Sequence, residues 1–374
     1  INNKDVVVGG DDFTVRGGAA DASIHQKQII AEQFANEYRL PIIRLIEGTG
    51  GGGSVKSLDT ESRTYIPANP GWDWVVDNLS TVPVIALALG PVAGLGAARM
   101  VTSHFSIMVE DIAQMFVAGP PVVKRLGQDL TKEELGGSKI HAKNGAIDIL
   151  VKSEEEAFEV TKKILSYLPS SVDGLPERGD IIDDPKRKDE WLLEAIPKDR
   201  RKIYDPRKII DSLVDKDSFL EFGHSHGQSV IAGLARLDGW PVAILAGDPM
   251  FYGAGWTSEA SNKVTRFVDI AETFHLPVVN LVDNPGFVIG LDAEKAATIR
   301  HGARALTAVY QATVPWCSVI LRKVFGVAGA AHMNANQIAD ALSSLGAQTE
   351  FDTQRLSASV SLRSLSDPAY LQPA

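Results

Sequence analysis

The sequence has 374 residues, 44% of them hydrophobic and 22% charged, a composition typical of a globular protein long enough for two hydrophobic cores. The formal net charge of −10 argues against a nucleic acid or an anionic membrane surface as the main partner. Cys317 is the single cysteine, so no intrachain disulfide can form, and no apolar run approaches the roughly 20 residues that span a bilayer.

The predicted elements alternate between strand and helix, and the same series occurs twice. Short apolar runs predict buried strands, and apolar residues at helical spacing predict the helices between them. The series strand, helix, strand occurs at residues 6–8, 23–38 and 42–46, and again at residues 242–245, 264–271 and 278–282. Both helices are predicted to stop at a Leu-Pro pair, because the residue before proline is disfavoured in a helix. This alternation predicts an α/β fold with mainly parallel strands.

The two series belong to an internal duplication. Leu40-Pro41 matches Leu276-Pro277 at an offset of 236 residues, and Val82-Pro83 matches Val314-Pro315 at an offset of 232. A period this long, occurring twice, indicates a duplicated domain rather than a solenoid. A duplicated domain predicts two related half-sites, so the search for chemistry becomes a search for paired loops.

The two ends of the duplication depart from this pattern. Residues 204–235 precede the second copy and nothing equivalent precedes the first, so Ile1 is expected to lie inside the first repeat of a fragment or a trimmed chain. The first copy continues into a predicted strand at residues 105–109, and no matching apolar run follows the second copy. Residues 337–374 are therefore expected to contain no equivalent of that strand, to be poorly ordered or packed abnormally, and to leave the isolated chain inactive or weakly active.

A segment rich in proline and charge separates the two copies. This composition is typical of a solvated linker between domains, and a partner-binding arm is the alternative. The predicted parts are an N-terminal domain with an incomplete start, the linker, a C-terminal domain with an incomplete end, and an atypical tail: residues 1–168, 169–205, 206–336 and 337–374.

The sequence lacks the usual catalytic constellations. Its eight histidines form no H-x-x-x-H or H-E-x-x-H pattern, and with one cysteine no metal site is expected. No G-x-S-x-G nucleophile elbow occurs. The glycine run at residues 48–53 lacks the lysine and hydroxyl residues of a phosphate-binding loop.

Paired loops of small residues offer a different chemistry. In each copy one strand leads into glycine, at Gly50 and Gly286, and another opens a helix through small residues, at 94–98 and 326–331. Small residues let backbone N–H groups approach a ligand closely. Two such donors aimed at one carbonyl oxygen form an oxyanion hole, which stabilises an enolate without a catalytic side chain. The alternative is that these glycines only permit tight packing of strand against helix.

Eight motifs follow one another between residue 1 and about residue 336: residues 12–18, 90–94, 118–124, 133–141, 282–287, 299–303, 313–315 and 322–326. In this combination and order the chain resembles the carboxyltransferase (β) subunits of biotin-dependent acyl-CoA carboxylases, of the propionyl-CoA and methylcrotonyl-CoA carboxylase kind. The resemblance implies two crotonase-type ββα-spiral domains. It also implies a homo-oligomer whose active site lies between the N-terminal domain of one subunit and the C-terminal domain of another.

The resemblance further implies a reaction. A carboxyl group passes from carboxybiotin to the α (or γ) carbon of an acyl-CoA through an enolate, and biotin itself is the base. The biotin carboxylase and biotin carrier are expected on another chain, because the sequence has no Ala-Met-Lys-Met run. The cytoplasm or the mitochondrial matrix is the expected location.

Carried over by position, the resemblance gives the paired loops their roles. One oxyanion would be held by N–H groups around Gly94, Leu95 and Gly96. The other would be held by those around Gly326, Val327 and Ala328. The residues predicted to contact the cofactor are Gly50, Gly51, Pro285, Gly286 and Phe287. Lys27 is predicted to contact a CoA phosphate, with a surface lysine of no special role as the alternative.

Two further hypotheses about function are compatible with the same residues. A decarboxylase subunit of a biotin-dependent sodium pump has the same domain plan and runs the reaction in reverse. A truncated, non-catalytic form that packs with full-length subunits is the other hypothesis.

Overall fold

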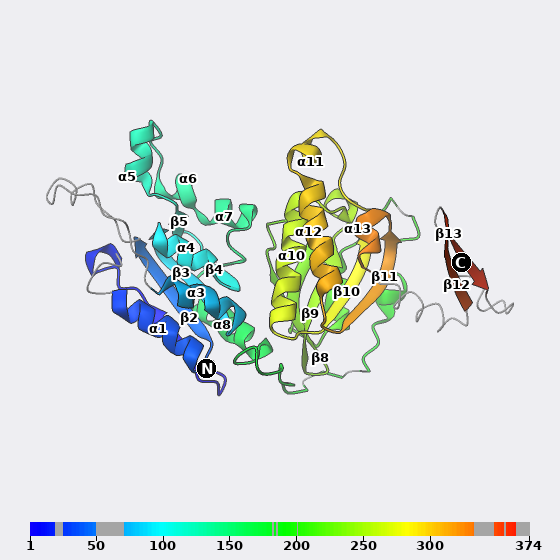
Figure 1. The fold of residues 1–374 in the computed structure, drawn as a ribbon, viewed down its shortest axis with the longest axis horizontal. Coiled ribbons are helices and arrows are strands. Elements are labelled where there is room, and N and C mark those ends of the chain that lie inside the picture. Colours follow the sequence, from blue (N-terminus) through cyan, green and yellow to red (C-terminus); the bar gives the residue numbers. More distant parts are fainter. Residues whose placement is uncertain are drawn as a thin grey trace.

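The computed structural model describes residues 1–18, 25–49, 71–181, 183–184, 186–199, 201–332, 348–354 and 357–363. Two β-sheets lie side by side, and helices pack against each of them (Figure 1). The predicted α/β class is confirmed.

The first sheet is parallel throughout and has the order β1-β2-β3-β4-β6, with β5 paired to the end of β3. Its central strands are apolar on both faces and buried, as expected of parallel strands covered by helices. Its strands are β1 (Val7–Gly10), β2 (Ile42–Thr49), β3 (Val84–Ala93), β4 (Phe105–Val109), β5 (Gln114–Phe116) and β6 (Ile149–Val151). The helices of this half are α1 (His25–Glu37), α3 (Trp72–Asp77), α4 (Leu95–Val101), α5 (Pro120–Val123), α6 (Lys132–Gly136), α7 (Ser138–Asn144) and α8 (Glu154–Tyr167).

The second sheet has the order β11-β10-β9-β8-β7 and is mixed. The pairs β9–β10 and β10–β11 are parallel, while β7–β8 and β8–β9 are antiparallel. Its strands are β7 (Leu220–Phe222), β8 (Val230–Leu237), β9 (Trp240–Gly247), β10 (Val278–Asn284) and β11 (Trp316–Val324). Its helices are α9 (Pro206–Leu213), α10 (Ser258–Thr273), α11 (Leu291–Lys295), α12 (Thr298–Gln311) and α13 (Gly326–Ala330).

The duplication extends to the strand register. Ile42 of β2 pairs with Val7 and Val84, and Val278 of β10, 236 residues later, pairs with the equivalent residues Ala243 and Trp316. The register also shifts at the same point in the β2–β3 and β10–β11 pairs. The shift lies between residues 46 and 48 in β2 and between residues 282 and 284 in β10. The predicted duplication is therefore visible in the register, although β7 and β8 have no counterpart in the described part of the first copy.

The two halves share one continuous apolar core. Phe105 of β4 meets Phe222 of β7 edge-on, with ring centroids 5.6 Å apart. Around this contact, Arg266 of α10 donates to both carboxylate oxygens of Asp148, at 3.0 and 2.8 Å. The Asp148 carbonyl also accepts from the N–H of Gly223, at 2.7 Å. The halves are thus held together by burial and by directed hydrogen bonds.

The segment between the halves is hydrogen-bonded to both of them. The N–H of Val172 donates to the Thr81 carbonyl of the first half, at 3.0 Å. The Val172 carbonyl contacts His275 Nε2 of the second half, at 2.7 Å. Further along, the Gly179 N–H donates to the Gly239 carbonyl, at 2.9 Å. Residues 169–205 therefore pack along the molecule where they are described.

Residues 337–374 contain two strands that the sequence analysis did not predict. β12 (Gln348–Gln354) and β13 (Ser357–Arg363) form an antiparallel hairpin, which pairs with neither of the main sheets. Residue types alternate along both strands, and an antiparallel hairpin needs no continuous apolar run. No described strand occupies the free edge of β11, so the β4 position of the first copy has no described equivalent in the second. Residues 337–347 and 364–374 lie outside the described residues.

We expect the stability of the fold to fall in mild acid because His104, at the start of β4, is buried as a neutral ring. Its Nδ1 accepts the Val84 N–H at 3.0 Å, and its Nε2 lies 3.0 Å from the Leu79 carbonyl. Burial, reinforced by the nearby charges of Arg266 and Arg44, lowers the His104 pKa to about 3. The unfolded chain therefore binds a proton that the folded chain does not. This contribution to stability is present above a pH of about 6.5 and is lost as the pH falls towards 3.

Urea denaturation at several pH values tests this prediction. The wild type should lose several kcal/mol more than His104→Gln on acidification, since the variant has no ring to protonate. If the free energies of unfolding of the two proteins fell in parallel between pH 7 and pH 4, the assignment to His104 would be contradicted.

No described helix is long and apolar enough to cross a bilayer.

Candidate functional site

The first paired loop lies where β3 leads into α4. Gly94 has φ 59° and ψ −120°, a conformation that a residue with a Cβ rarely adopts. Its N–H donates to the Phe116 carbonyl of β5, at 3.1 Å, so this N–H is already bonded within the protein. The N–H groups of Leu95 and Gly96 come next, in the first turn of α4, where they have no acceptor inside the helix.

Gly96 brings this turn close to the end of β2. A Cβ at Gly96 would lie 3.2 Å from Val92 Cγ1 and 3.4 Å from the Gly48 carbonyl oxygen. Close packing is therefore one reason for glycine at this position, as the alternative interpretation expected. The same closeness sets the first turn of α4 directly beside the end of β2.

The second paired loop also turns at a glycine with positive φ, where β11 leads into α13. Gly326 has φ 66°, matching Gly94 at the offset of 232 residues. Val327 is exposed and Ala328 is buried. Gly286, which follows β10, packs against this turn: a Cβ there would lie 3.4 Å from the Phe325 carbonyl oxygen and 3.9 Å from the Gly326 Cα. The structure thus brings together Gly286 and the residues that open α13.

The loop containing Gly286 is held on both sides. Its N–H donates to Asn284 Oδ1 at 2.7 Å, and its carbonyl accepts the Trp256 N–H at 3.0 Å. Pro285 is exposed beside it. Phe287 packs inward, because a Cβ at Gly302 would come within 2.4 Å of its ring. Phe287 therefore supports the loop from inside, Gly286 is buried, and Pro285 is the exposed residue of the loop.

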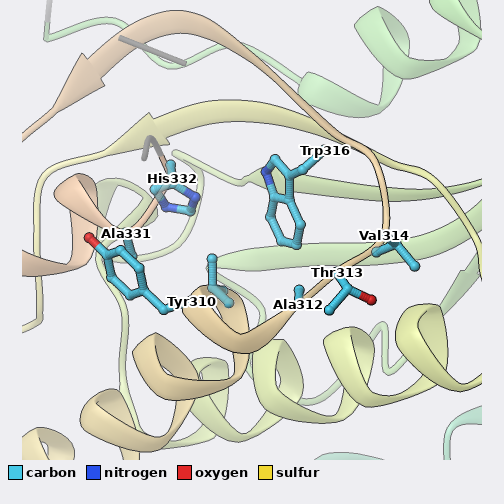
Figure 2. A pocket seen from close by; sticks show the side chains of 8 residues that line it. Tyr310, Ala312, Thr313, Val314, Trp316, Ala331 and His332 are labelled. Atoms are coloured by element: carbon cyan, nitrogen blue, oxygen red, sulfur yellow. The ribbon is translucent and has the colours of Figure 1, made fainter. Parts of the chain in front are cut away.

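Sequence reasoning missed His332, which is buried directly behind this loop. Asn284 Nδ2 lies 3.0 Å from His332 Nε2, and Asn280 Nδ2 lies 2.9 Å from His332 Nδ1. Burial lowers the His332 pKa to about 4, so the ring is neutral at neutral pH. Its ring, Trp316 and Tyr310 line a cavity of about 290 Å³, and Figure 2 shows the rings of His332 and Tyr310 on one side and that of Trp316 on the other. A lone histidine gives no local sequence signal for such a position.

A second feature that the sequence did not reveal is a buried ion cluster at the end of β10. Asp283 Oδ2 accepts from Tyr204 Oη at 2.9 Å and from Arg322 Nε at 3.1 Å. Burial and the Asp283 charge raise the pKa of Tyr204. Lys323 Nζ lies 3.8 Å from Asp283 Oδ1 and donates to the Gly253 carbonyl at 3.0 Å. The cluster anchors the strand that carries Asn284 and Gly286.

The Carboxyl transferase domain family matches this chain over residues 1–350. The chain belongs to this family. The resemblance described from the motifs is thereby confirmed, and the duplicated α/β fold is consistent with the two crotonase-type domains that it implied.

Relatives and solved structures agree with this assignment. The chain is 34% identical over 340 residues to the biotin-dependent acetyl-/propionyl-coenzyme A carboxylase beta5 subunit of Mycobacterium leprae, covering 87% of this chain and 60% of that protein. It is 31% identical over 332 residues to the methylmalonyl-CoA decarboxylase subunit alpha of Veillonella parvula, covering 87% and 64%. The transcarboxylase 12S structure, a hexamer assembly with methylmalonyl-coenzyme A and methylmalonic acid bound, matches with a TM-score of 0.80 and 31% identity, covering 88% of this chain and 64% of that one. This carboxyl transferase chain thus spans less than two thirds of the length of these relatives.

The two paired loops of this carboxyl transferase chain belong to different sheets. In Figure 1, α4 lies with the first sheet and α13 with the second, and α10 and α12 are drawn between them. Exposed apolar residues accompany each loop. Val117, 96% exposed, follows Phe116, whose carbonyl accepts the Gly94 N–H, and Phe325, 57% exposed, directly precedes Gly326.

The remaining predicted contacts do not lie with these loops or are not described. Lys27 is exposed near the start of α1. Its repeat equivalent, Lys263, is buried instead, donates to the Val230 carbonyl at 2.6 Å, and has a pKa lowered to about 8 by burial. Gly50 and Gly51 lie outside the described residues. Among the residues that are described, no group of three or more His, Cys, Asp or Glu is placed to hold a metal ion.

Proposed function

We propose that this chain transfers a carboxyl group from carboxybiotin to the α (or γ) carbon of an acyl-CoA. The observation that carries the proposal is the pair of matching turns, at Gly94 and Gly326, each at the end of a register-equivalent strand. Each turn presents backbone N–H groups at the start of a helix, where they have no acceptor inside that helix. This arrangement suits a reaction whose charge develops on carbonyl oxygens.

In the proposed mechanism the chain supplies donors and position. The N–H groups of Leu95 and Gly96 hold one developing oxyanion, and those of Val327 and Ala328 hold the other. One pair of N–H groups would stabilise the thioester enolate oxygen, and the other would bind the ureido oxygen of biotin. Gly94 itself sets the turn, since its own N–H is bonded to Phe116. Carboxybiotin would supply the carboxyl group and, after its loss, the base.

Fit to the cofactor rests on the second loop. Gly286 and Gly326 pack against each other, and a Cβ on either would lie within 3.9 Å of the other's backbone. Pro285 and Gly286 are proposed contacts for the cofactor beside this turn, with Phe287 supporting them. Gly50 and Gly51 are proposed for the equivalent place in the first half. Lys27 remains a proposed contact for a CoA phosphate.

The proposed assembly follows from the separation of the two loops. The exposed apolar residues beside each loop fit a homo-oligomer in which residues 1–168 of one subunit face residues 206–336 of another. We propose that a separate chain supplies the biotin carboxylase and the biotin carrier, in a reducing compartment, the cytoplasm or the mitochondrial matrix. The similarity to the Veillonella parvula decarboxylase subunit favours one alternative, the same transfer run in reverse.

A labelling experiment tests the proposed activity. Carrier protein bearing carboxybiotin with a ¹⁴C-labelled carboxyl group is mixed with the purified protein and propionyl-CoA. Label is expected in the acyl-CoA, and the transfer is expected to need the biotinylated carrier. Hydration of an enoyl-CoA at a substantial rate without any biotin would instead show that the chain is a hydratase of the same fold.

A further inference from the structure

His332 is linked to the Gly286 loop by a fixed series of hydrogen bonds. Asn284 Oδ1 accepts the Gly286 N–H at 2.7 Å, which turns its amide nitrogen away from the loop. That nitrogen lies 3.0 Å from His332 Nε2, so the ring accepts a hydrogen bond and is neutral. The orientation of the Asn284 amide is therefore set from both ends.

The ring and backbone of His332 are themselves held. Its carbonyl accepts from Ser318 Oγ of β11 at 2.6 Å. Its ring meets the Trp256 ring edge-on, with centroids 5.2 Å apart, and the Trp256 N–H donates to the Gly286 carbonyl at 3.0 Å. Trp256 therefore holds the loop through the Gly286 carbonyl, and His332 holds it through Asn284, which accepts the Gly286 N–H. With the Asn280 contact on the other ring nitrogen, the imidazole has one available position.

The first half of the molecule forms its fold without this arrangement. At the offsets of the duplication, Met100 stands where His332 stands, and Gly48 stands where Asn284 stands. Met100 is fully buried, so an apolar side chain fills the equivalent space in the first half. The hydrogen-bond series is thus not a requirement of the strand–turn–helix unit. It belongs to the second loop alone.

We propose that His332 is a positioning residue of the second half-site, which acts through Asn284 to hold the Gly286 loop against the turn at Gly326. This inference rests on the proposed function: the contact between the Gly286 loop and the Gly326 turn keeps the N–H groups of Val327 and Ala328 directed at the oxyanion that they bind. Displacement of reacting groups by about 1 Å costs on the order of 10²-fold in rate, so a small shift of this loop would matter.

The duplication itself suggests the test. His332→Met installs the residue that the first half uses at the equivalent position, and it should fold. His332→Gln keeps an amide oxygen that can accept from Asn284. His104→Met is the matched control, since His104 is also a buried neutral histidine but lies away from both loops. Amide hydrogen exchange at Gly286 and steady-state kinetics are measured for all four proteins.

His332→Met is expected to speed exchange at Gly286 and to lower kcat by about 10- to 100-fold, with a smaller change in KM. His332→Gln should restore most of both properties, and His104→Met should leave both unchanged. Unaltered exchange at Gly286 in His332→Met, or a kcat equal to that of the wild type, would overturn the proposal. A wild type without any carboxyl transfer would refute the proposed function, and exchange at Gly286 would still decide whether His332 holds the loop.

Discussion

Replacing Leu95 or Val327 with proline is expected to lower carboxyl transfer by about 10²–10³-fold, the usual cost of one lost oxyanion donor. Leu95 is the first residue of α4 and follows Gly94, so proline there removes an N–H that no helix carbonyl could have accepted. Val327 is its equivalent in α13. The fold should persist, because proline is tolerated in the first turn of a helix.

The matched controls are Leu95→Ala and Val327→Ala, which shorten the side chains and keep the N–H groups. Both should retain nearly full transfer, measured with the labelled carrier and checked for folding by circular dichroism. Full activity in the two folded proline variants would exclude these N–H groups as oxyanion donors. Gly94 and Gly326 are poor sites for the same test, because their φ values of 59° and 66° are inaccessible to proline.

The largest expected loss of stability comes from Glu32, in the first half. Arg44 is fully buried in β2 and donates to both Glu32 carboxylate oxygens, at 2.7 and 2.8 Å. Burial acts to raise the Glu32 pKa, but Arg44 and Arg99 outweigh it, so the pKa is lowered and the carboxylate is charged. Glu32→Gln should therefore destabilise the protein by about 3–5 kcal/mol, because it leaves the buried Arg44 without its counter-charge.

Urea denaturation at neutral pH measures this loss. Glu159→Gln is the control, since its pair with Lys162 is exposed and should contribute at most about 1 kcal/mol. The double variant Glu32→Leu with Arg44→Met should recover most of the loss, because it removes both charges together. A Glu32→Gln variant as stable as Glu159→Gln would show that the negative charge of Glu32 is not needed to stabilise the buried Arg44.

Local signals in the sequence predicted the strand–helix series and the duplication. The Leu-Pro pairs ended the helices close to the observed ends at Glu37 and Thr273, and the offsets of 236 and 232 reappear as equal strand registers. The hairpin β12–β13 was not predicted because its two short strands are polar and lack the apolar run of a buried parallel strand.

The loops could be located from sequence, whereas the partners of their atoms could not. The Gly94 N–H donates to the Phe116 carbonyl only because the fold brings the two residues together. The sequence alone therefore could not show that this N–H is already bonded. His332 and Asn284 are 48 residues apart and meet only because β10 and α13 are neighbours. Equivalent positions also diverge: Lys27 is exposed while Lys263 is buried, and sequence matching alone treats the two as the same.

A crystal structure of the homo-oligomer with biotin and a ketone analogue of an acyl-CoA would test the central claim most directly. We expect one ligand oxygen at roughly 2.7–3.1 Å from the N–H groups of Leu95 and Gly96. The other ligand should place its oxygen at a similar distance from those of Val327 and Ala328, with the two turns contributed by different subunits. Both ligands bound away from the two turns would contradict the account.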